Sequence, residues 1–315
     1  VPVEPDFEAK SPLFDELLAN ALGEDEEGEA QKEVLQMAFG ATLARTLWTY
    51  RKVLFLYGAS STGKSTLLDL LRNFFPPEVV GAVNPASWEN EYHAAALAGK
   101  AVNMVGEIDG TTPIPGGVFK SFTGGDLVSG RHPTHKPIYF RCTASQIFNG
   151  NRLPPTRDKT MAFFVRWLIV EFSRPIPIDR QIACLADRIF EEEQAAVLAW
   201  MLNGAAKLAK RGSFPETPQH KRLIDYWRAG NNSALQFVMD LDYVELKEPP
   251  QPVPGMEAFQ LYRQWAREVG VKALGRNAFY EALYEGGARL GVSVADDRNG
   301  VKVVRGIGLK KTIPG

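Results

Sequence analysis

The segment from Gly58 to Ser65 (GASSTGKS) combines glycines, hydroxyl groups and one lysine at the spacing GxxxxGK[ST]. Successive backbone N–H groups in such a loop can surround a phosphate, and the N-terminus of a following helix adds positive partial charge. Lys64 would reach the β- and γ-phosphates, and the Ser65 hydroxyl would bind Mg²⁺. We therefore expect a nucleoside triphosphate site formed by Gly58, Ala59, Ser60, Ser61, Thr62, Gly63, Lys64, Ser65 and Thr66.

The residues on both sides of this loop favour the phosphate-binding interpretation. The apolar run VLFLY predicts a buried strand at 52–57, and the apolar spacing after Ser65 predicts a helix that continues to about Phe75. The alternative is a glycine-rich turn with a solvated lysine. The full motif between a strand and a helix disfavours that alternative.

Two carboxylates follow the next predicted strand, at 101–105. Glu107 and Asp109 lie two residues apart, so on an extended backbone they point the same way. At the end of a strand next to the phosphate-loop strand, they could hold Mg²⁺ and polarise an attacking water. Two acidic residues in a solvated loop are the alternative, and the sequence leaves open which carboxylate faces the metal.

An asparagine and an arginine further along the chain are also candidates. Asn151 follows an apolar strand predicted at 144–149, where an amide could orient water, although an asparagine there is also a common turn residue. Arg166 lies in the apolar stretch 163–170, which predicts a strand with one embedded arginine. Because arginine is rarely buried unpaired, Arg166 needs an anionic partner. That partner is either a salt-bridging carboxylate or the nucleotide of a neighbouring subunit.

Composition and charge narrow the class of protein. The 315 residues suggest two domains, and we expect a soluble, cytoplasmic protein because no apolar run of membrane length and no signal peptide is evident. The net charge is −1, yet residues 111–166 carry 8 basic and 2 acidic side chains, which fits a nucleic-acid channel or a set of phosphate-binding residues. Cys142 and Cys184 are too few and too distant for a zinc site, and we expect both to be small core residues.

The order of predicted elements indicates an α/β fold. Helices are expected in residues 1–50. Strands and helices alternate from Lys52 to about Arg174, with further strands at 126–130, 137–142 and 166–172. Two helices at 179–191 and 191–211 follow and complete a core domain of residues 51–211. Residues 212–248 are predicted to be helical, and the prolines of 249–255 predict a stiff linker. Within 256–315, helices at 256–270 and 276–286 precede strands at 292–295 and 301–304 around an Asn-Gly turn, an order typical of a winged-helix module.

The order of motifs over residues 10–211 resembles the superfamily 3 helicases, and most of all the helicase portion of the phage and plasmid (poxvirus-like) primase–helicases. The motifs are the phosphate loop, LAGK at 97–100, GEID at 106–109, FTGGD at 122–126, NRLP at 151–154 and Arg166. The resemblance implies an AAA+-like P-loop NTPase core that forms a homo-oligomeric, hexameric ring around DNA, with ATP and Mg²⁺ at the subunit interfaces. It implies catalytic roles for Lys64, Glu107, Asp109, Asn151 and Arg166, the last acting in trans, and metal ligation by Ser65, Glu107 and Asp109. The second arginine that the family usually has beside the finger is replaced here by Val165.

The same resemblance implies a hairpin that enters the ring channel, where Arg131, His132, His135 and Lys136 would contact DNA phosphates without sequence preference. A basic surface hairpin without a partner is the alternative. The implied activity is that of an ATP-dependent DNA helicase or translocase in phage, plasmid or mobile-element replication, with a primase either fused or separate. A nucleotide-gated origin-binding or loading ATPase that does not unwind DNA stays open, and a small-molecule kinase is less supported because no acceptor site is evident.

Overall fold

The computed structural model describes residues 3–108, 112–230, 232–240, 243–246, 252–269, 271–297 and 299–310. The chain forms two compact units, Val1–Ile224 and Asp225–Gly315. Helix α8 (Pro218–Gly230) runs across the boundary between them. Within the described ranges, none of the helices is both long and apolar enough to cross a membrane.

The first unit is built on a five-stranded parallel sheet, which confirms the predicted α/β class. Its strand order is β2 (Val80–Gly81), β3 (Val102–Val105), β6 (Ser145–Gly150), β1 (Val53–Gly58) and β7 (Trp167–Phe172). Because helices cover both faces of a parallel sheet, its central strands are apolar at successive positions. Residues 53–56 of β1 are accordingly all buried.

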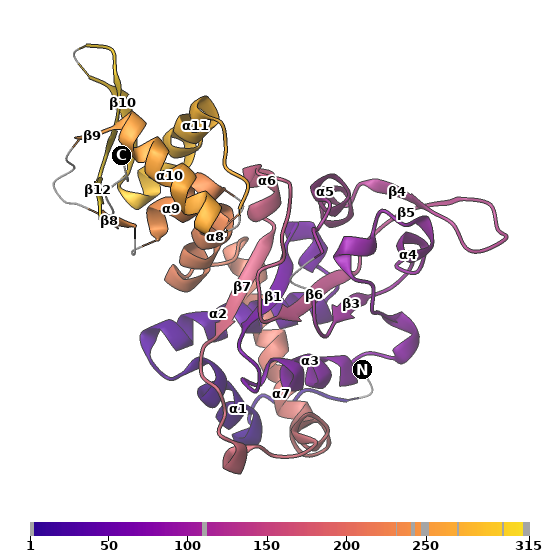
Figure 1. Cartoon of the computed structure of the whole chain (residues 1–315). Coiled ribbons are helices and arrows are strands. Elements are labelled where there is room, and N and C mark those ends of the chain that lie inside the picture. The colour runs from indigo at the N-terminus through magenta and orange to yellow at the C-terminus, as the bar shows by residue number, and fades with distance from the viewer. Residues whose placement is uncertain are drawn as a thin grey trace. The chain divides into compact units, whose positions relative to one another are not determined.

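The two faces of the sheet have different partners. Leu54 and Leu56 belong to a cluster with helices α1 (Pro12–Leu22), α2 (Glu26–Leu43), α3 (Lys64–Asn73) and α7 (Leu185–Arg211). Phe55 points to the opposite face, where its ring lies 5.7 Å from that of Trp167, which stacks on Phe119 of α5 (Gly116–Gly124) at 4.9 Å. Figure 1 shows α1, α3 and α7 on one side of the sheet and α5 on the other.

The N-terminal helices share the core of this unit. Helices α2 and α7 approach so closely that a Cβ added to Gly204 would lie 2.0 Å from the backbone oxygen of Gln36. Glu193 of α7 accepts hydrogen bonds from the backbone N–H groups of Leu13 and Phe14, at 2.9 and 3.0 Å. The carboxylate thereby satisfies free donors at the start of α1 and fixes that helix against α7.

A two-stranded hairpin extends from the first unit. Strands β4 (Leu127–Gly130) and β5 (Ile138–Arg141) pair antiparallel, and β4 packs against α4 (Glu91–Ala95). The strands predicted at 126–130, 137–142, 144–149 and 166–172 match β4, β5, β6 and β7 to within one residue at each end.

Three predictions about secondary structure and burial in the first unit were wrong. Arg166 is not embedded in a strand, because residues Met161–Phe164 form the short helix α6 and Arg166 lies in the turn before β7. The helices predicted at 179–191 and 191–211 are replaced by a 3₁₀ turn at Ile178–Arg180 and one continuous helix, α7. Cys142 is buried as expected, whereas Cys184 is exposed because it precedes α7 in a left-handed turn with φ 52°.

The second unit packs helices against a small sheet. Helices α9 (Ser233–Met239), α10 (Gly255–Val269) and α11 (Arg276–Gly286) enclose an aromatic core with Phe237, Tyr262, Trp265 and Phe279. Strands β10 (Ser293–Asp296) and β11 (Lys302–Arg305) form the predicted hairpin, with Gly300 at φ 74° in its turn. The 3₁₀ turn Gly287–Leu290 precedes this hairpin, and β8 (Val244–Leu246) pairs with β12 (Ile307–Leu309).

The proline-rich segment is not a linker throughout. Its described part forms strand β9 (Pro252–Pro254), which pairs antiparallel with β11 at the edge of the three-stranded sheet. An edge strand tolerates proline because the missing N–H can face away from the neighbouring strand.

Candidate functional site

The loop from Gly58 to Gly63 joins β1 to α3 in a conformation that uses positive φ angles. Gly58 has φ 153°, and a Cβ there would lie 2.1 Å from the backbone oxygen of Phe172. Ser61 and Gly63 also have positive φ, at 59° and 89°. Such a backbone can turn successive N–H groups towards one concave side, and α3 begins directly after it at Lys64. The strand, turn and helix therefore follow the predicted order, and anion binding by this loop stays a prediction.

The Lys64 side chain folds back onto this loop. Its ammonium group donates to the backbone oxygen of Gly58 at 2.8 Å, to the Thr62 hydroxyl at 3.2 Å and to the backbone oxygen of Ala59. Burial lowers the pKa of Lys64 below its ordinary value, and the nearby charge of Glu107 partly opposes this shift. An anion in the loop would offer the ammonium group a charged acceptor in place of neutral carbonyls.

Glu107 lies two strands away from the loop strand, because β6 separates β1 from β3. The prediction that its strand is next to β1 was therefore wrong. With neighbouring strands about 4.8 Å apart, this arrangement places the end of β3 about 10 Å from the end of β1. Glu107 is exposed at the carboxyl end of β3.

The intervening strand β6 brings in Asn149, which the sequence reasoning had not chosen. Asn149 is 2% exposed, its Nδ2 lies 3.5 Å from the Ser65 hydroxyl oxygen, and its backbone oxygen accepts a hydrogen bond from Ile108. The signal in the sequence for Asn149 was an amide side chain within the last two residues of the strand, rather than one that follows the strand. The predicted Asn151 lies just beyond the strand and is exposed.

These side chains meet in one polar pocket of about 220 Å³ at the carboxyl end of the sheet. Every lining residue is polar or glycine: Ser60, Ser61, Thr62, Gly63, Lys64, Ser65, Thr66, Gly106, Glu107, Asn149, Gly150 and Asn151. Asp109 lies outside the described residues. Among the described residues, no group of three or more His, Cys, Asp or Glu side chains could hold a metal ion.

Arg166 is not part of this pocket. Its backbone oxygen accepts a hydrogen bond from Val53 N at the start of β1, whereas the loop follows the end of β1. Five residues of strand separate the two ends, or about 17 Å. The Arg166 guanidinium donates to the backbone oxygen of Ala162, and within the described part of the chain its buried Nε has no hydrogen-bond partner.

The electrostatic surroundings of Arg166 are mixed. Burial lowers its pKa, and the positive charge of Arg51 adds to this effect, whereas Asp126 and Asp158 oppose it. Asp158 already forms an ion pair with Lys120 at 2.7 Å. Arg166 therefore lies near carboxylates but does not share a dedicated buried ion pair with either of them.

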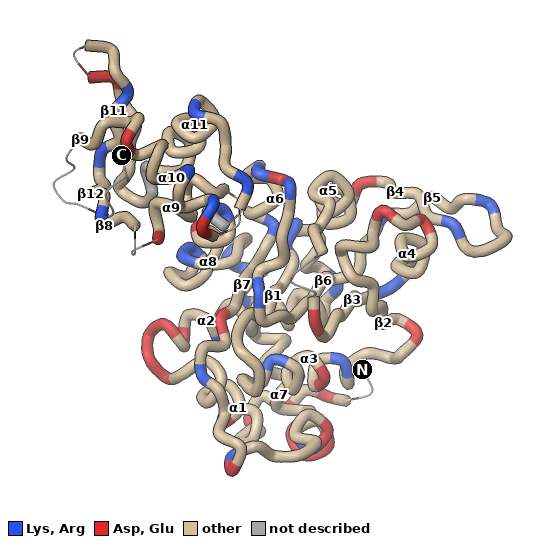
Figure 2. Tube along the Cα trace, in the orientation of Figure 1, with Lys and Arg blue, Asp and Glu red and all other residues tan. Residues whose placement is uncertain are grey.

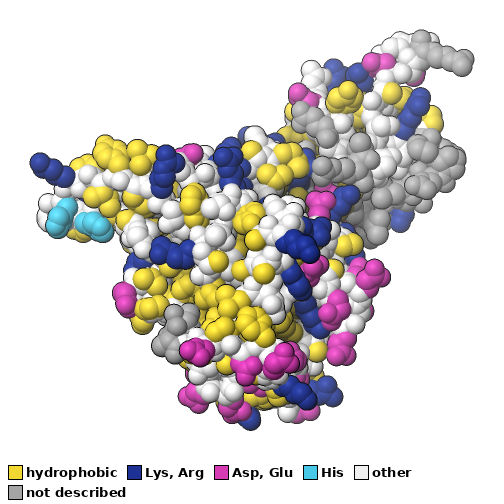
Figure 3. Space-filling view, turned by 180° about the vertical axis from the view of Figure 1, so that it is seen from behind, with side chains coloured by type: hydrophobic (Ala, Val, Ile, Leu, Met, Phe, Trp, Pro, Cys, Tyr) yellow, Lys and Arg dark blue, Asp and Glu magenta, His cyan; other side chains and the backbone are white. Residues whose placement is uncertain are grey.

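The β4–β5 hairpin carries the four predicted DNA-contacting residues, and the structure divides them into two groups. Arg131 forms an ion pair with Glu91 at 2.6 Å, donates to the Tyr92 hydroxyl at 3.1 Å and lies over the Tyr92 ring. These partners raise the pKa of Arg131, the hydrogen bond to Tyr92 contributing most. His132, His135 and Lys136 are exposed in the connecting loop, where Figure 2 shows basic residues near the tip and Figure 3 shows histidine side chains at the surface.

Comparisons with known proteins give one family match and a similarity of fold. A model of the family described as "Family of unknown function (DUF5906)" matches residues 56–166, which include the phosphate loop, Glu107 and the hairpin. No curated protein matches the chain. A structure of the NrS-1 C-terminal region in its A form is similar at 13% identity and a TM-score of 0.52, covering 98% of this chain and 77% of that one. A second structure of that region, residues 305–718, gives 12% identity, a TM-score of 0.47 and coverage of 96% and 77%. The first of these structures shows that the chain shares its fold with the NrS-1 C-terminal region.

Proposed function

We propose that this chain is an ATP-dependent DNA helicase or translocase of phage, plasmid or mobile-element replication. The observation that carries the proposal is the polar pocket in which the phosphate loop, Lys64, Glu107 and two asparagines converge. The pocket offers a positive charge and hydrogen-bonding groups that could bind a triphosphate. It also contains a carboxylate, about two strand spacings from the loop.

Each residue has a chemical role in this proposal. Lys64 would exchange its carbonyl partners for the β- and γ-phosphates and neutralise their charge, while Ser65 and Glu107 would hold Mg²⁺. Bound Mg²⁺ supplies charge stabilisation for the transferred phosphoryl group. Glu107 polarises the attacking water, and Asn149 or Asn151 orients it. Positioning and charge stabilisation therefore account for most of the catalysis.

The surrounding architecture supports an AAA+-like P-loop core followed by a winged-helix module. In the first unit, the parallel sheet presents the loop and Glu107 at the same edge, as phosphate sites of open α/β sheets require. In the second unit, helices α10 and α11 precede the β10–β11 hairpin, the order expected of a winged helix.

Two further features support a ring that encloses DNA. Arg166 lies about 17 Å from its own loop, so its guanidinium could complete only the site of a neighbouring copy. The hairpin presents Lys136, His132 and His135 to solvent, as sequence-independent contacts with DNA phosphates require. A hexamer with ATP between subunits satisfies both features.

The test measures ATP hydrolysis with and without DNA, together with displacement of a labelled strand from a forked duplex. Lys64→Ala should abolish hydrolysis and most nucleotide binding, because the ammonium group neutralises the bound phosphates. Glu107→Gln should bind nucleotide but hydrolyse it poorly, since the carboxylate acts on metal and water. Lys210→Ala, an exposed lysine at the end of α7, is the matched control.

The outcomes separate the candidate functions. DNA-stimulated hydrolysis with strand displacement supports the helicase. Nucleotide-dependent DNA binding with slow hydrolysis and no displacement would instead identify an origin-binding or loading ATPase. Unchanged hydrolysis in Glu107→Gln would assign the catalytic carboxylate elsewhere.

A further inference from the structure

The β4–β5 hairpin is attached to the rest of the first unit at two places. At its base, the ring of Phe140 lies 6.4 Å from the ring of Phe122 on α5. Nearer the tip, β4 packs against α4, and a Cβ added to Gly130 would lie 2.7 Å from the backbone nitrogen of Ala95. Figure 1 shows α4 beside the hairpin. The attachment to α4 governs the position of the tip, because the loop of residues 131–137 follows directly after it.

The hairpin needs such attachments to keep a fixed position. A two-stranded hairpin alone is at best marginally stable in water. One face of this hairpin is open to solvent, since Leu127 is 63% exposed and Tyr139 is 70% exposed. Its position therefore depends on the contacts that its other face and its loop make with α4 and α5.

Arg131, the first residue of the loop, is bound to α4 by both its backbone and its side chain. Its backbone N–H donates to the backbone oxygen of Glu91 at 3.0 Å. Its Nη2 lies 2.6 Å from Glu91 Oε1 and 3.1 Å from the Tyr92 hydroxyl oxygen, and its guanidinium carbon lies 5.5 Å from the centroid of the Tyr92 ring. A carboxylate, a hydroxyl group and an aromatic face together restrict the guanidinium to one position. We call Arg131, Glu91 and Tyr92 the hairpin anchor.

The other basic side chains of the loop have different surroundings. His132, His135 and Lys136 are exposed, and Figure 2 shows basic residues near the tip. A DNA phosphate could reach these side chains directly. At Arg131, a phosphate would first have to displace the Glu91 carboxylate. The loop therefore combines an exposed cationic tip with an arginine that is bound to the body of the unit.

We infer that the hairpin anchor positions the exposed tip for DNA, and that Arg131 holds the hairpin rather than contacting a phosphate. The inference rests on the proposed function, in which the tip binds DNA. Glu91 and Tyr92 are then positioning residues, which act on DNA binding only through the place of the hairpin. Without the anchor the tip occupies other positions for part of the time. The apparent affinity for DNA falls in proportion to the fraction of molecules in the competent position.

The test measures binding of a labelled single strand of DNA to the full chain by fluorescence anisotropy at several salt concentrations. Glu91→Gln removes the ion pair and keeps the size of the side chain, and it should weaken DNA binding about two- to fivefold. The slope of log affinity against log salt concentration should stay unchanged, because no phosphate contact is lost. Arg131→Ala should weaken binding at least as much, with little change in the slope. The double variant should weaken binding no further, since both residues act through one anchor.

The direction of the Glu91→Gln effect separates positioning from simple electrostatics. Loss of a negative charge beside a basic hairpin should by itself strengthen DNA binding. Glu89 supplies the matched control, because it is an exposed glutamate on the same segment. Glu89→Gln should not weaken DNA binding, whereas Glu91→Gln should.

Hydrogen exchange without DNA tests the anchor independently of DNA binding. Backbone amides of residues 127–141 should exchange faster in Glu91→Gln than in the unmodified chain or in Glu89→Gln, because the hairpin separates from α4 more often. Tighter DNA binding by Glu91→Gln with a steeper salt slope would overturn the inference and make Arg131 a DNA contact that Glu91 masks. Unchanged affinity and unchanged exchange would also overturn it. If the unmodified chain bound no DNA, the proposed function would fail, and faster exchange in Glu91→Gln would still support the anchor.

Discussion

Replacing Arg166 with alanine tests whether the active site is shared between neighbouring copies of the chain. If the guanidinium completes the site of a neighbour, Arg166→Ala should bind ATP normally and hydrolyse it about 10³- to 10⁵-fold more slowly. Within one copy, the distance between Arg166 and the loop allows only a small effect of this substitution on hydrolysis. A large loss of hydrolysis would therefore indicate a shared site.

Within one copy, Arg166 and the phosphate loop lie at opposite ends of β1, about 17 Å apart. Two unit charges at that distance in water interact by about 0.2 kcal/mol, and salt screens this further because the Debye length is about 8 Å. An effect within one copy should therefore change hydrolysis less than about twofold. A loss of 10³ or more can come only from the neighbouring site.

The effect on folding should also be small. Asp158 keeps Lys120 as its partner, and Asp126 is exposed, so removal of Arg166 leaves no buried carboxylate uncompensated. We expect the free energy of unfolding to fall by less than about 1 kcal/mol. Thermal unfolding of the variant measures this directly.

The decisive assay mixes Arg166→Ala subunits with Lys64→Ala subunits. In a head-to-tail ring assembled at random from equal amounts, roughly a quarter of the interfaces pair an intact loop with an intact finger. Hydrolysis should recover towards roughly a quarter of the unmodified rate. No recovery on mixing, or a marked loss of stability in Arg166→Ala alone, would refute the shared site and leave a structural arginine. A specific rate that is independent of protein concentration down to nanomolar levels would have the same consequence.

Three further predictions concern DNA binding, pH dependence and packing. Lys136→Ala should lower the slope of log affinity against log salt concentration for DNA binding by about 0.7 to 0.9. Arg131→Ala should lower this slope less, because Arg131 is already paired within the chain. Equal slopes for both variants and the unmodified chain would show that DNA binds elsewhere. Burial lowers the pKa of Lys64 below the ordinary lysine value of about 10.4. As the pH rises, Lys64 should therefore lose its positive charge at a lower pH than an ordinary lysine. Titration calorimetry should show that ATP affinity falls as this charge is lost. Gly204→Ala should destabilise the first unit by about 1–3 kcal/mol in denaturant unfolding, because the new methyl group meets the α2 backbone. Gly117→Ala, which meets no atom within 4 Å, is the control, and equal stability of the two variants would contradict the close packing of α2 and α7.

The strand, loop and helix that carry the GxxxxGK[ST] motif, and the other sheet strands, could be predicted because their determinants are local. A run of apolar residues in β1, glycines at positive φ and a helical spacing after Lys64 act within about twenty residues of each other. Strands β4 to β7 were likewise predictable from short runs bounded by turn residues. The residue types in the loop are therefore the basis on which its phosphate-binding role is proposed.

The predictions that were wrong concern features that depend on long-range packing. The order of strands in a sheet is decided by long-range packing, so the insertion of β6 between β1 and β3 left no mark in the sequence around Glu107. For the same reason the sequence did not single out Asn149, whose side chain approaches Ser65 only because β6 lies beside β1. The predicted Asn151 lines the same pocket. Proline composition suggested a linker, yet pairing with β11 made Pro252–Pro254 an edge strand.

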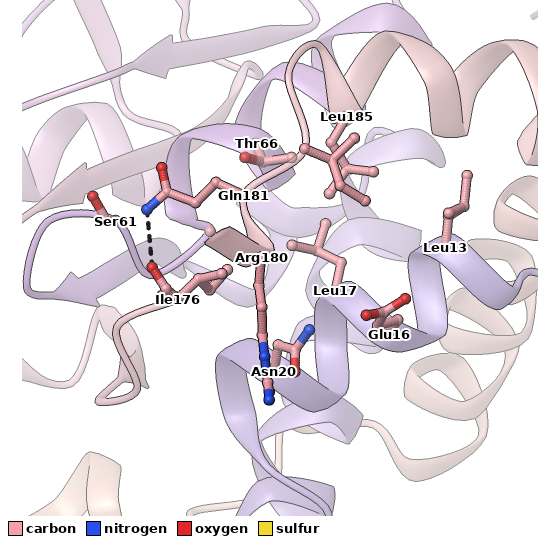
Figure 4. A pocket seen from close by; sticks show the side chains of 12 residues that line it. Leu13, Glu16, Leu17, Asn20, Ser61, Thr66, Ile176, Arg180, Gln181 and Leu185 are labelled. Atoms are coloured by element: carbon pink, nitrogen blue, oxygen red, sulfur yellow. Dashed lines mark hydrogen bonds between the residues drawn. The ribbon is translucent and has the colours of Figure 1, made fainter. Parts of the chain in front are cut away.

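The sequence by itself determined the strand, loop and helix around the GxxxxGK[ST] motif, the α/β class and a basic hairpin, since each depends on residues close together in the chain. Tertiary structure decided which side chains share a cavity. It brings Glu107 and Asn149 close to the loop and places Arg166 at the opposite end of the strands. It also places α1 and the segment before α7 around a second cavity beside the loop (Figure 4). These placements arise from the burial of apolar faces between elements far apart in sequence, and local patterns do not encode which faces will meet.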